Sequence, residues 1–162
     1  MEKEEIINQF CKNQKETEEC IIAFFNNYLI NHKGVILLLE GNLGAGKTTI
    51  TKTIGKLLHI NQIINSPSFN IYNIYTNEKN ALLHYDLYRI SHLELEEMEL
   101  RELWNEQYEN KFTVHAIEWW QKAQYIQSNL PIYLIQIEQN INQFTERTLR
   151  IFKICGNKYE LS

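Results

Sequence analysis

The hydrophobic positions along the first third of the chain change from helical to strand-like spacing and back. Residues 17–31 carry apolar side chains three or four positions apart, which predicts a helix with Thr17 as its N-cap. Residues 35–39 form a continuous apolar run of the kind found in buried parallel strands. Three glycines fall within 41–46 and predict a turn, and helical spacing returns over 47–58. This segment therefore predicts a helix, a strand, a glycine turn and a second helix.

Shorter elements of both kinds are predicted in the rest of the chain. Strand patterns lie at 69–75, 81–85, 112–117, 132–137 and 148–154, and helical patterns lie at 93–104 and 121–127. The polar turn 76–80 predicts that the first two of these strands form a hairpin, and we expect the last two to pair antiparallel. The alternation of helices and strands predicts an α/β sandwich of three layers, with a mixed, mostly parallel central sheet and added antiparallel strands. We find no linker and no repeat, so residues 1–162 are expected to form a single domain.

Composition narrows the class of protein. With 44% apolar and 22% charged residues, the 162-residue chain is neither a disordered tail nor a collagen-like fibre. The net charge of −4 argues against a broad basic face that binds DNA or RNA independently. The apolar run at 35–39 is far shorter than the roughly 20 residues of a membrane span. The acidic start of the chain is unlike a signal peptide, and we expect a cytoplasmic protein.

The three cysteines support that expectation. Cys11, Cys20 and Cys155 are odd in number and have no metal-ligand spacing. We expect them to be free, buried thiols, which persist in a reducing compartment.

The glycine turn carries the strongest chemical signal. Residues 41–48 read Gly-Asn-Leu-Gly-Ala-Gly-Lys-Thr and match G-x-x-x-x-G-K-[ST], the phosphate-binding loop or P-loop. Its glycines allow backbone N–H groups to surround an anion, and the helix that follows adds its positive end. Lys47 supplies a cation for the β- and γ-phosphates, and the Thr48 hydroxyl is a ligand for the accompanying Mg²⁺. The sequence therefore predicts a P-loop NTPase.

Two predicted strands each end in a carboxylate. Asp86 ends the strand at 81–85, and Glu118 ends the strand at 112–117. Ligands in open α/β sheets bind at the carboxyl ends of strands, so both side chains are candidates to hold Mg²⁺ or to orient water. The sequence leaves open which of the two is the dominant acid on the metal side.

Three further features each have two interpretations. The segment Ser66-Pro67-Ser68-Phe69 is either an ordinary turn or a switch loop that senses the γ-phosphate. Arg89 is either a salt-bridge partner or a charge stabiliser at the phosphates. Trp119 and Trp120 are either core residues or, beside Glu118, a contact for a nucleotide or a partner protein.

Four blocks in order resemble the TsaE (formerly YjeE) family, the P-loop ATPases of bacterial threonylcarbamoyladenosine synthesis on tRNA. Residues 41–49 resemble the family's G-D-L-G-A-G-K-T-T, and residues 66–69 resemble S-P-T-F. Residues 84–89 match H-x-D-x-Y-R, and residues 117–119 match I-E-W. The resemblance runs from about residue 17 to residue 154.

This resemblance implies cofactors and residue roles. The cofactors are ATP and Mg²⁺, with Thr48 and Glu118 as metal ligands and with Asp86 and Lys47 as the residues needed for hydrolysis. The cofactor-binding residues are Gly41, Leu43, Gly44, Ala45, Gly46, Lys47, Thr48, Thr49, Ser66, Ser68 and Trp119.

The resemblance also implies partners. Family members act with the TsaD and TsaB proteins in threonylcarbamoyl transfer to the adenosine beside the anticodon, so that contact with tRNA is indirect. Their ATPase activity is weak alone, and it resets the complex rather than performing the transfer.

The departures from the family pattern are few. Asn42 replaces an aspartate and Ser68 replaces a threonine, and neither change removes a reacting group. Glu99 stands about where the family often has glycine, so the loop after the acidic helix is expected to differ.

Two other functions compete with this one. A P-loop kinase for nucleotides or small molecules needs a lid with several cations, whereas the arginines beyond the P-loop helix are only Arg89, Arg101, Arg147 and Arg150. A non-catalytic nucleotide switch does not need the full set of Lys47, Thr48, Asp86 and Glu118.

Overall fold

The computed structural model describes residues 2–67, 69–105 and 107–160, and its main feature is a seven-stranded sheet. The strands of this sheet are β1 (Lys3–Cys11), β2 (Gly34–Gly41), β3 (Tyr72–Thr76), β4 (Asn80–Asp86), β5 (Phe112–Glu118), β7 (Ile132–Gln139) and β8 (Arg147–Ile154). A small second sheet pairs β6 (Tyr125–Gln127) with β9 (Lys158–Glu160). The helices are α1 (Gln14–Phe24) with a π-helical continuation η1 (Phe25–Leu29), α2 (Lys47–Leu57), α3 (His92–Glu97), α4 (Leu100–Leu103) and the 3₁₀ turn η2 (Trp120–Ala123).

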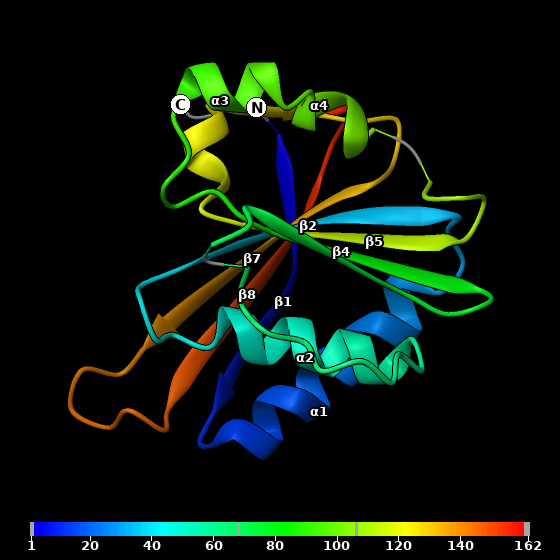
Figure 1. Ribbon diagram of the computed structural model, residues 1–162. Helices are drawn as coiled ribbons and strands as arrows, with labels where there is room; N and C mark the ends of the chain where they lie inside the picture. Colours follow the sequence, from blue (N-terminus) through cyan, green and yellow to red (C-terminus); the bar gives the residue numbers. More distant parts are fainter. Residues whose placement is uncertain (1, 68, 106, 161–162) are drawn as a thin grey trace.

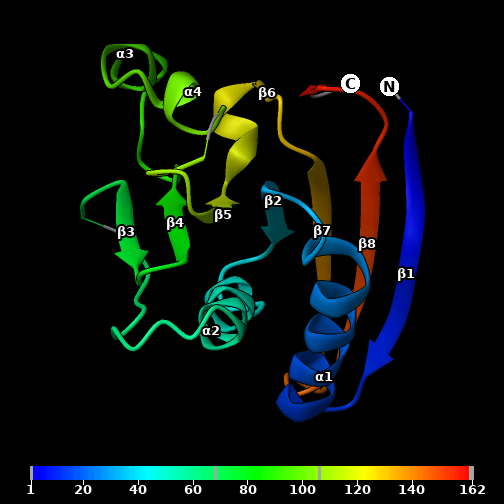
Figure 2. The same ribbon diagram turned by 90° about the vertical axis from the view of Figure 1, so that its right-hand side faces the viewer.

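The strands lie in the order β1-β8-β7-β2-β5-β4-β3, which Figure 2 shows across the sheet. The four central strands, β7, β2, β5 and β4, run parallel to one another. The outer pairs β7–β8, β8–β1 and β4–β3 are antiparallel. Helices α1 and α2 cover one face, while α3, α4 and η2 lie on the other (Figure 1). This is the expected three-layer α/β sandwich with antiparallel strands added to a parallel centre.

β2 runs through the middle of the molecule and contributes to two hydrophobic cores. Val35, Leu37 and Leu39 pack with α1 and α2 on one face of the sheet, whereas Ile36 and Leu38 pack toward α3, α4 and η2 on the other. All five side chains are 0–1% exposed. Because successive side chains in a strand point to opposite faces, a strand buried on both faces must be apolar throughout.

The structure changes four boundaries of the predicted elements. The first helix begins at Gln14 and its N-cap is Asn13, whose Oδ1 accepts a bond of 3.0 Å from the Glu16 N–H, so Thr17 is not the N-cap. The strand expected from residue 69 begins at Tyr72. The predicted helix 93–104 is broken at Glu99, which has the left-handed φ of 51° that glycine adopts at the least cost. The segment expected as helix 121–127 is instead the turn η2 followed by β6.

Two strands were not predicted at all. β1 has a charged, mostly exposed sequence and is itself an edge strand of the sheet, where it pairs with β8. Charged side chains are common on edge strands, where they oppose pairing with other chains, and they hide the alternating pattern. β9 has only three residues and pairs with β6.

The cysteines are free thiols, as expected, but only Cys11 is buried, whereas Cys20 is half-buried and Cys155 is exposed. Burial raises the pKa of the Cys20 thiol to about 11. Within the described ranges, every helix is too short or too polar to cross a membrane.

The cap at Asn13 gives a test of where the first helix starts. Asn13→Ala removes the acceptor for the Glu16 N–H and is expected to lower the free energy of unfolding by about 1 kcal/mol. Asn13→Asp keeps an acceptor and serves as the control. Urea denaturation measures both, and equal stability of Asn13→Ala and the wild type would contradict this boundary.

Candidate functional site

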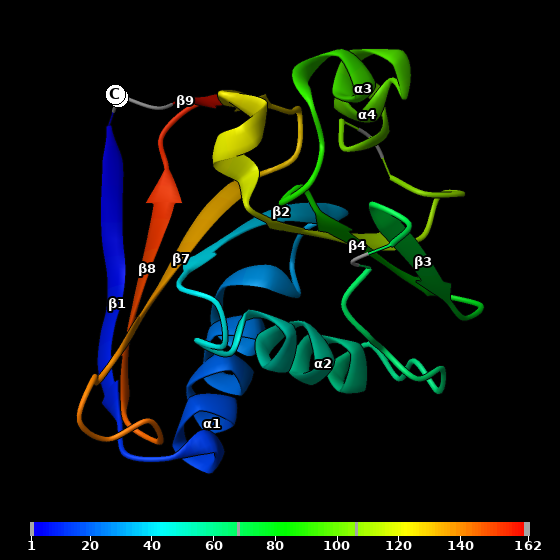
Figure 3. The same cartoon turned by 60° about the vertical axis from the view of Figure 1, so that its left-hand side comes forward.

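The glycine turn joins β2 to α2 at the carboxyl end of the parallel strands (Figure 3). Gly46 immediately precedes α2 with a φ of 111°, a backbone conformation that other residues adopt only with strain. A Cβ at this position would also lie 2.5 Å from the Arg147 guanidinium. A Cβ at Gly41 would lie 2.9 Å from the Ile137 carbonyl oxygen. The backbone of β7 therefore excludes a side chain at position 41, and the left-handed backbone disfavours one at position 46.

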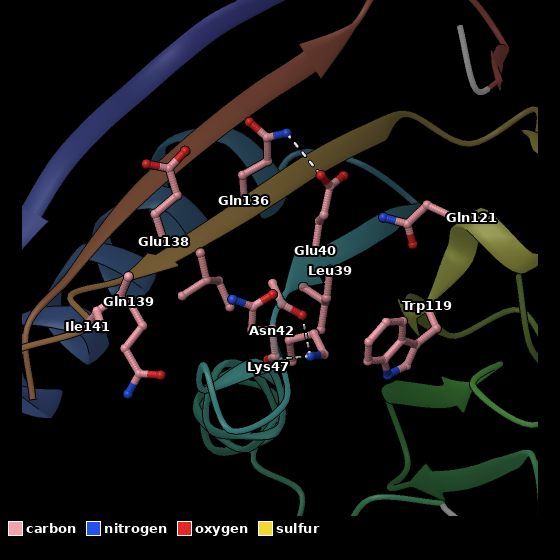
Figure 4. A pocket seen from close by; sticks show the side chains of 12 residues that line it. Leu39, Glu40, Asn42, Lys47, Trp119, Gln121, Gln136, Glu138, Gln139 and Ile141 are labelled. Carbon is pink, nitrogen blue, oxygen red and sulfur yellow. Dashed lines mark hydrogen bonds between the residues drawn. The ribbon is translucent and has the colours of Figure 1, made fainter. Parts of the chain in front are cut away.

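Lys47 folds back over this turn. Its ammonium Nζ donates to the carbonyl oxygens of Gly41 at 2.7 Å and of Asn42 at 3.0 Å (Figure 4). It also lies 4.9 Å from the centre of the Trp119 ring, and the residue is only 5% exposed. Burial lowers the pKa of Lys47, and the nearby carboxylates of Glu118 and Asp86 oppose that shift. The site thus holds a cation whose acceptors are the carbonyl groups of the turn itself.

Glu118 is the carboxylate that meets the P-loop threonine. Its Oε1 accepts the Thr48 hydroxyl at 3.2 Å and lies 2.8 Å from His84 Nε2. Glu118 ends β5 and pairs with Leu39 of β2, two residues before the glycine turn begins. The residue is only 4% exposed, so its charge depends on these polar neighbours.

Asp86 lies beside Glu118 because the two residues are opposite each other in the parallel pairing of β4 with β5. Its Oδ2 accepts the Ser66 hydroxyl at 3.2 Å, and its Oδ1 accepts the Tyr88 N–H at 3.1 Å. Asp86 is therefore connected to the loop after α2, whereas Glu118 is connected to α2 itself.

These groups line a cavity of about 550 Å³. Its walls are formed by Leu43, Gly44, Gly46, Lys47, Thr48, Thr49, Ser66, Asp86, Tyr88, Arg89, Glu118 and Trp119. Two predicted cofactor-binding residues are not in this wall. The carbonyl oxygen of Gly41 accepts a hydrogen bond from Lys47, and Ala45, within the turn, is fully buried. Ser68, which was also predicted, lies outside the described residues.

The two tryptophans have different roles in the structure. Trp119 lines the cavity with its ring 4.9 Å from that of Tyr88, whereas Trp120 is 2% exposed and belongs to the second hydrophobic core. The two side chains point to different places because Trp119 has a left-handed φ of 56°, which turns the chain between β5 and η2.

A second cavity of about 450 Å³ is also lined by Lys47 and Trp119 (Figure 4). Its polar wall includes Glu40 at the end of β2 and Gln136 of β7, whose amide donates to Glu40 at 3.3 Å. Lys47 and Trp119 line both cavities.

Sequence reasoning missed two residues that support the site. Arg147 at the start of β8 donates to the Ala45 carbonyl at 3.2 Å from behind the glycine turn. No local pattern marks it, because 102 residues separate the two in sequence. His84 lies in the H-x-D-x-Y-R block, to which the resemblance assigns no role at that position, and this block is the signal in the sequence that marks it.

The donor set fits a phosphate chain with Mg²⁺. The glycine turn and the start of α2 offer backbone N–H groups, and Lys47 offers a cation. Thr48 and Glu118 present a hydroxyl and a carboxylate 3.2 Å apart, and oxygen ligands of this kind suit Mg²⁺. Within the described residues, no group of three or more His, Cys, Asp or Glu side chains is arranged to hold a metal ion.

Comparisons with known proteins identify one family. The model of the family described as "Threonylcarbamoyl adenosine biosynthesis protein TsaE" matches residues 11–149. A Bacillus subtilis protein named "tRNA threonylcarbamoyladenosine biosynthesis protein TsaE" is 38% identical over 128 residues, which are 79% of this chain and 75% of the relative. A Rickettsia prowazekii protein of the same name is 34% identical over 142 residues, 87% of this chain and 91% of the relative.

The fold has a counterpart among solved structures. The crystal structure of YdiB from Bacillus subtilis superimposes with a TM-score of 0.62, covering 96% of this chain and 89% of that one at 23% identity. At that identity the likeness concerns the fold, which is the mixed α/β sandwich described above. The family match spans the glycine turn, both carboxylates and the strands from β2 to β7, and the chain therefore belongs to the TsaE family.

Proposed function

We propose that this protein binds and hydrolyses ATP with Mg²⁺ as a subunit required for threonylcarbamoyladenosine modification of tRNA next to the anticodon. One observation carries the proposal: Lys47, Thr48, Asp86 and Glu118, from three separate parts of the chain, line a single cavity at the P-loop. The biological role rests on membership of the TsaE family, which is named for threonylcarbamoyl adenosine biosynthesis. Residues 1–162 act as one ATPase domain in this account.

The P-loop residues bind the phosphates and the metal ion. Lys47 exchanges the carbonyl oxygens of Gly41 and Asn42 for β- and γ-phosphate oxygens, because an anionic acceptor makes the stronger hydrogen bond. Thr48 and Glu118 hold Mg²⁺, which when bound neutralises charge on the phosphates. The backbone N–H groups of residues 43–48 orient the chain of phosphates, and Trp119 closes one side of the cavity.

Asp86 orients the attacking water and connects hydrolysis to the loop after α2. Its carboxylate faces the same cavity as Glu118 but accepts from Ser66, so a change at the γ-phosphate reaches Ser66 through one hydrogen bond. Loops held in this way are released when the γ-phosphate leaves. We propose that this release changes the affinity for the partner proteins.

The partners are the TsaD and TsaB proteins, and tRNA is contacted through them. The net charge of −4 supports an indirect role, because it disfavours tight binding to a polyanion. Neither DNA nor a membrane is needed for this function, and the proposed location is the cytoplasm.

The positions of the arginines argue against the alternative function, a P-loop kinase. Arg101 donates to the backbone of Ala123 and Tyr125, Arg147 supports the glycine turn from behind, and Arg150 pairs with Glu5. Arg89 is the one arginine beyond α2 that lines the cavity, and all four lie in the described ranges. Kinases of this class bring several cations to the transferred phosphate.

The test of the function is the steady-state rate of ATP hydrolysis by the purified protein, alone and with TsaD and TsaB from the same organism. We expect a slow rate alone and strong stimulation by the two proteins together. An unstimulated rate, with nucleosides or small alcohols accepting phosphate instead, would favour the kinase.

Removing the Lys47 cation should weaken nucleotide binding. Hydrogen bonds to charged groups contribute about 1.5–3 kcal/mol each, so Lys47→Ala is expected to lower ATP affinity by about 10- to 100-fold. Calorimetric titration with ATP and Mg²⁺ measures this. Lys52→Ala is the matched control, because Lys52 is an exposed lysine on the same helix. Wild-type affinity in Lys47→Ala would refute the site.

Asp86 should affect turnover rather than binding. Asp86→Asn removes the charge but keeps one oxygen that can accept the Tyr88 N–H, while its amide N–H can donate to the Ser66 hydroxyl oxygen. We expect hydrolysis to fall by roughly 100-fold or more with ATP affinity nearly unchanged. Single-turnover hydrolysis in the complex with TsaD and TsaB measures the loss. If Asp86→Asn turns over at the wild-type rate, another group orients the water.

A further inference from the structure

A buried histidine, His84, lies directly behind the candidate metal ligands. It belongs to β4 and is 0% exposed, on the same face of the sheet as Glu118 and α2. It does not line the cavity, and so it has no route to direct contact with a nucleotide. A fully buried imidazole loses its hydration, and such a side chain is retained at low cost only where it makes a specific hydrogen bond.

That hydrogen bond is to the same oxygen that Thr48 uses. Glu118 Oε1 lies 2.8 Å from His84 Nε2 and 3.2 Å from Thr48 Oγ1. An ionised carboxylate only accepts, so Nε2 carries the proton of the imidazole and donates it. Two donors thus converge on Oε1 from two directions, one from the neighbouring strand and one from α2. This leaves Oε2 as the oxygen that is available to Mg²⁺ or to a water bound to it.

The other ring nitrogen of His84 restricts its chemistry. Nδ1 is buried and has no hydrogen-bond partner among the described residues. A proton relay needs a second group to which the proton passes, and none is in place at Nδ1 within that part of the chain. The imidazole is therefore equipped to hold Glu118 in position and not to pass a proton onward.

We propose that His84 is a positioning residue that fixes the rotamer of Glu118, so that one carboxylate oxygen is committed to the P-loop threonine and the other is presented to Mg²⁺. The inference rests on the proposed Mg²⁺–ATP site. Partners of this kind behind a metal ligand typically change metal affinity or activity by about 10- to 100-fold when they are removed. The effect should appear in the dependence on Mg²⁺ and not in the affinity for the nucleotide itself.

Two substitutions distinguish the donor from the bulk of the ring. His84→Gln places an amide N–H near the position of Nε2, whereas His84→Asn is one bond shorter and does not reach Glu118. Both are polar and fit within the space of the imidazole, so the pair tests the hydrogen bond at nearly equal cost to folding. His115→Asn is the matched control: it is also 0% exposed, but it lies on β5, facing the opposite core, and bonds to the Tyr85 hydroxyl at 2.9 Å.

The measurement is equilibrium binding of a fluorescent ATP analogue at fixed nucleotide concentration while Mg²⁺ is varied, with no turnover required. His84→Asn is expected to raise the half-saturating Mg²⁺ concentration by about 10-fold or more. His84→Gln and His115→Asn should stay near the wild-type value, and nucleotide affinity without Mg²⁺ should be the same in all four proteins.

Each other outcome refutes a specific claim. Wild-type Mg²⁺ dependence in His84→Asn, or equal shifts in His84→Asn and His115→Asn, would overturn the positioning role while leaving the ATP site intact. A wild-type protein that binds the analogue with no dependence on Mg²⁺, or does not bind it, would overturn the proposed function and this inference with it.

Discussion

The register of β5 between β2 and β4 places Glu118 opposite Leu39 on one side and opposite Asp86 on the other. Parallel strands end at the same edge of a sheet, so this pairing brings the glycine turn and both carboxylates to one place. A shift by one residue would turn Glu118 toward the opposite core and bury its charge among apolar side chains. The site therefore depends on the apolar residues of β2, which hold the sheet in this register from both faces.

The two carboxylates differ in what they connect. Glu118 is almost fully buried and bonds to Thr48 and His84, which form a short polar chain from α2 through β5 to β4. Asp86 is half-buried and bonds to Ser66, in the loop that follows α2. A buried polar chain stiffens its surroundings when its bonds are made, whereas a partly exposed bond to a loop is easily exchanged. In the proposed function, Glu118 holds the metal ion and Asp86 responds to the γ-phosphate, and both carboxylates line one cavity.

The sequence predicted those parts of the site that depend on local spacing. Three features are predictable because each is encoded within a few residues. They are the P-loop pattern, the carboxylates that end β4 and β5, and the hairpin of β3 with β4. The choice between Asp86 and Glu118 on the metal side was left open, and the Thr48 contact with Glu118 now favours Glu118. The division between Trp119 and Trp120 depended on one backbone angle that no pattern in the sequence reveals.

Other features depend on contacts between distant residues. Arg147 reaches the glycine turn only because β8 lies beside β7, and the edge strand β1 exists only because β8 offers it a partner. The break at Glu99 follows from a left-handed backbone in a sequence with strong helical periodicity. Tertiary contacts override local propensity at such points.

The most direct test of this account is a crystal structure with Mg²⁺ and a non-hydrolysable ATP analogue. The account predicts phosphates within the glycine turn, Lys47 Nζ moved from the carbonyl oxygens of Gly41 and Asn42 to the phosphates, and the metal ion at Thr48 on the side of Glu118. A nucleotide bound elsewhere, with Lys47 still donating to those two carbonyl groups, would contradict it.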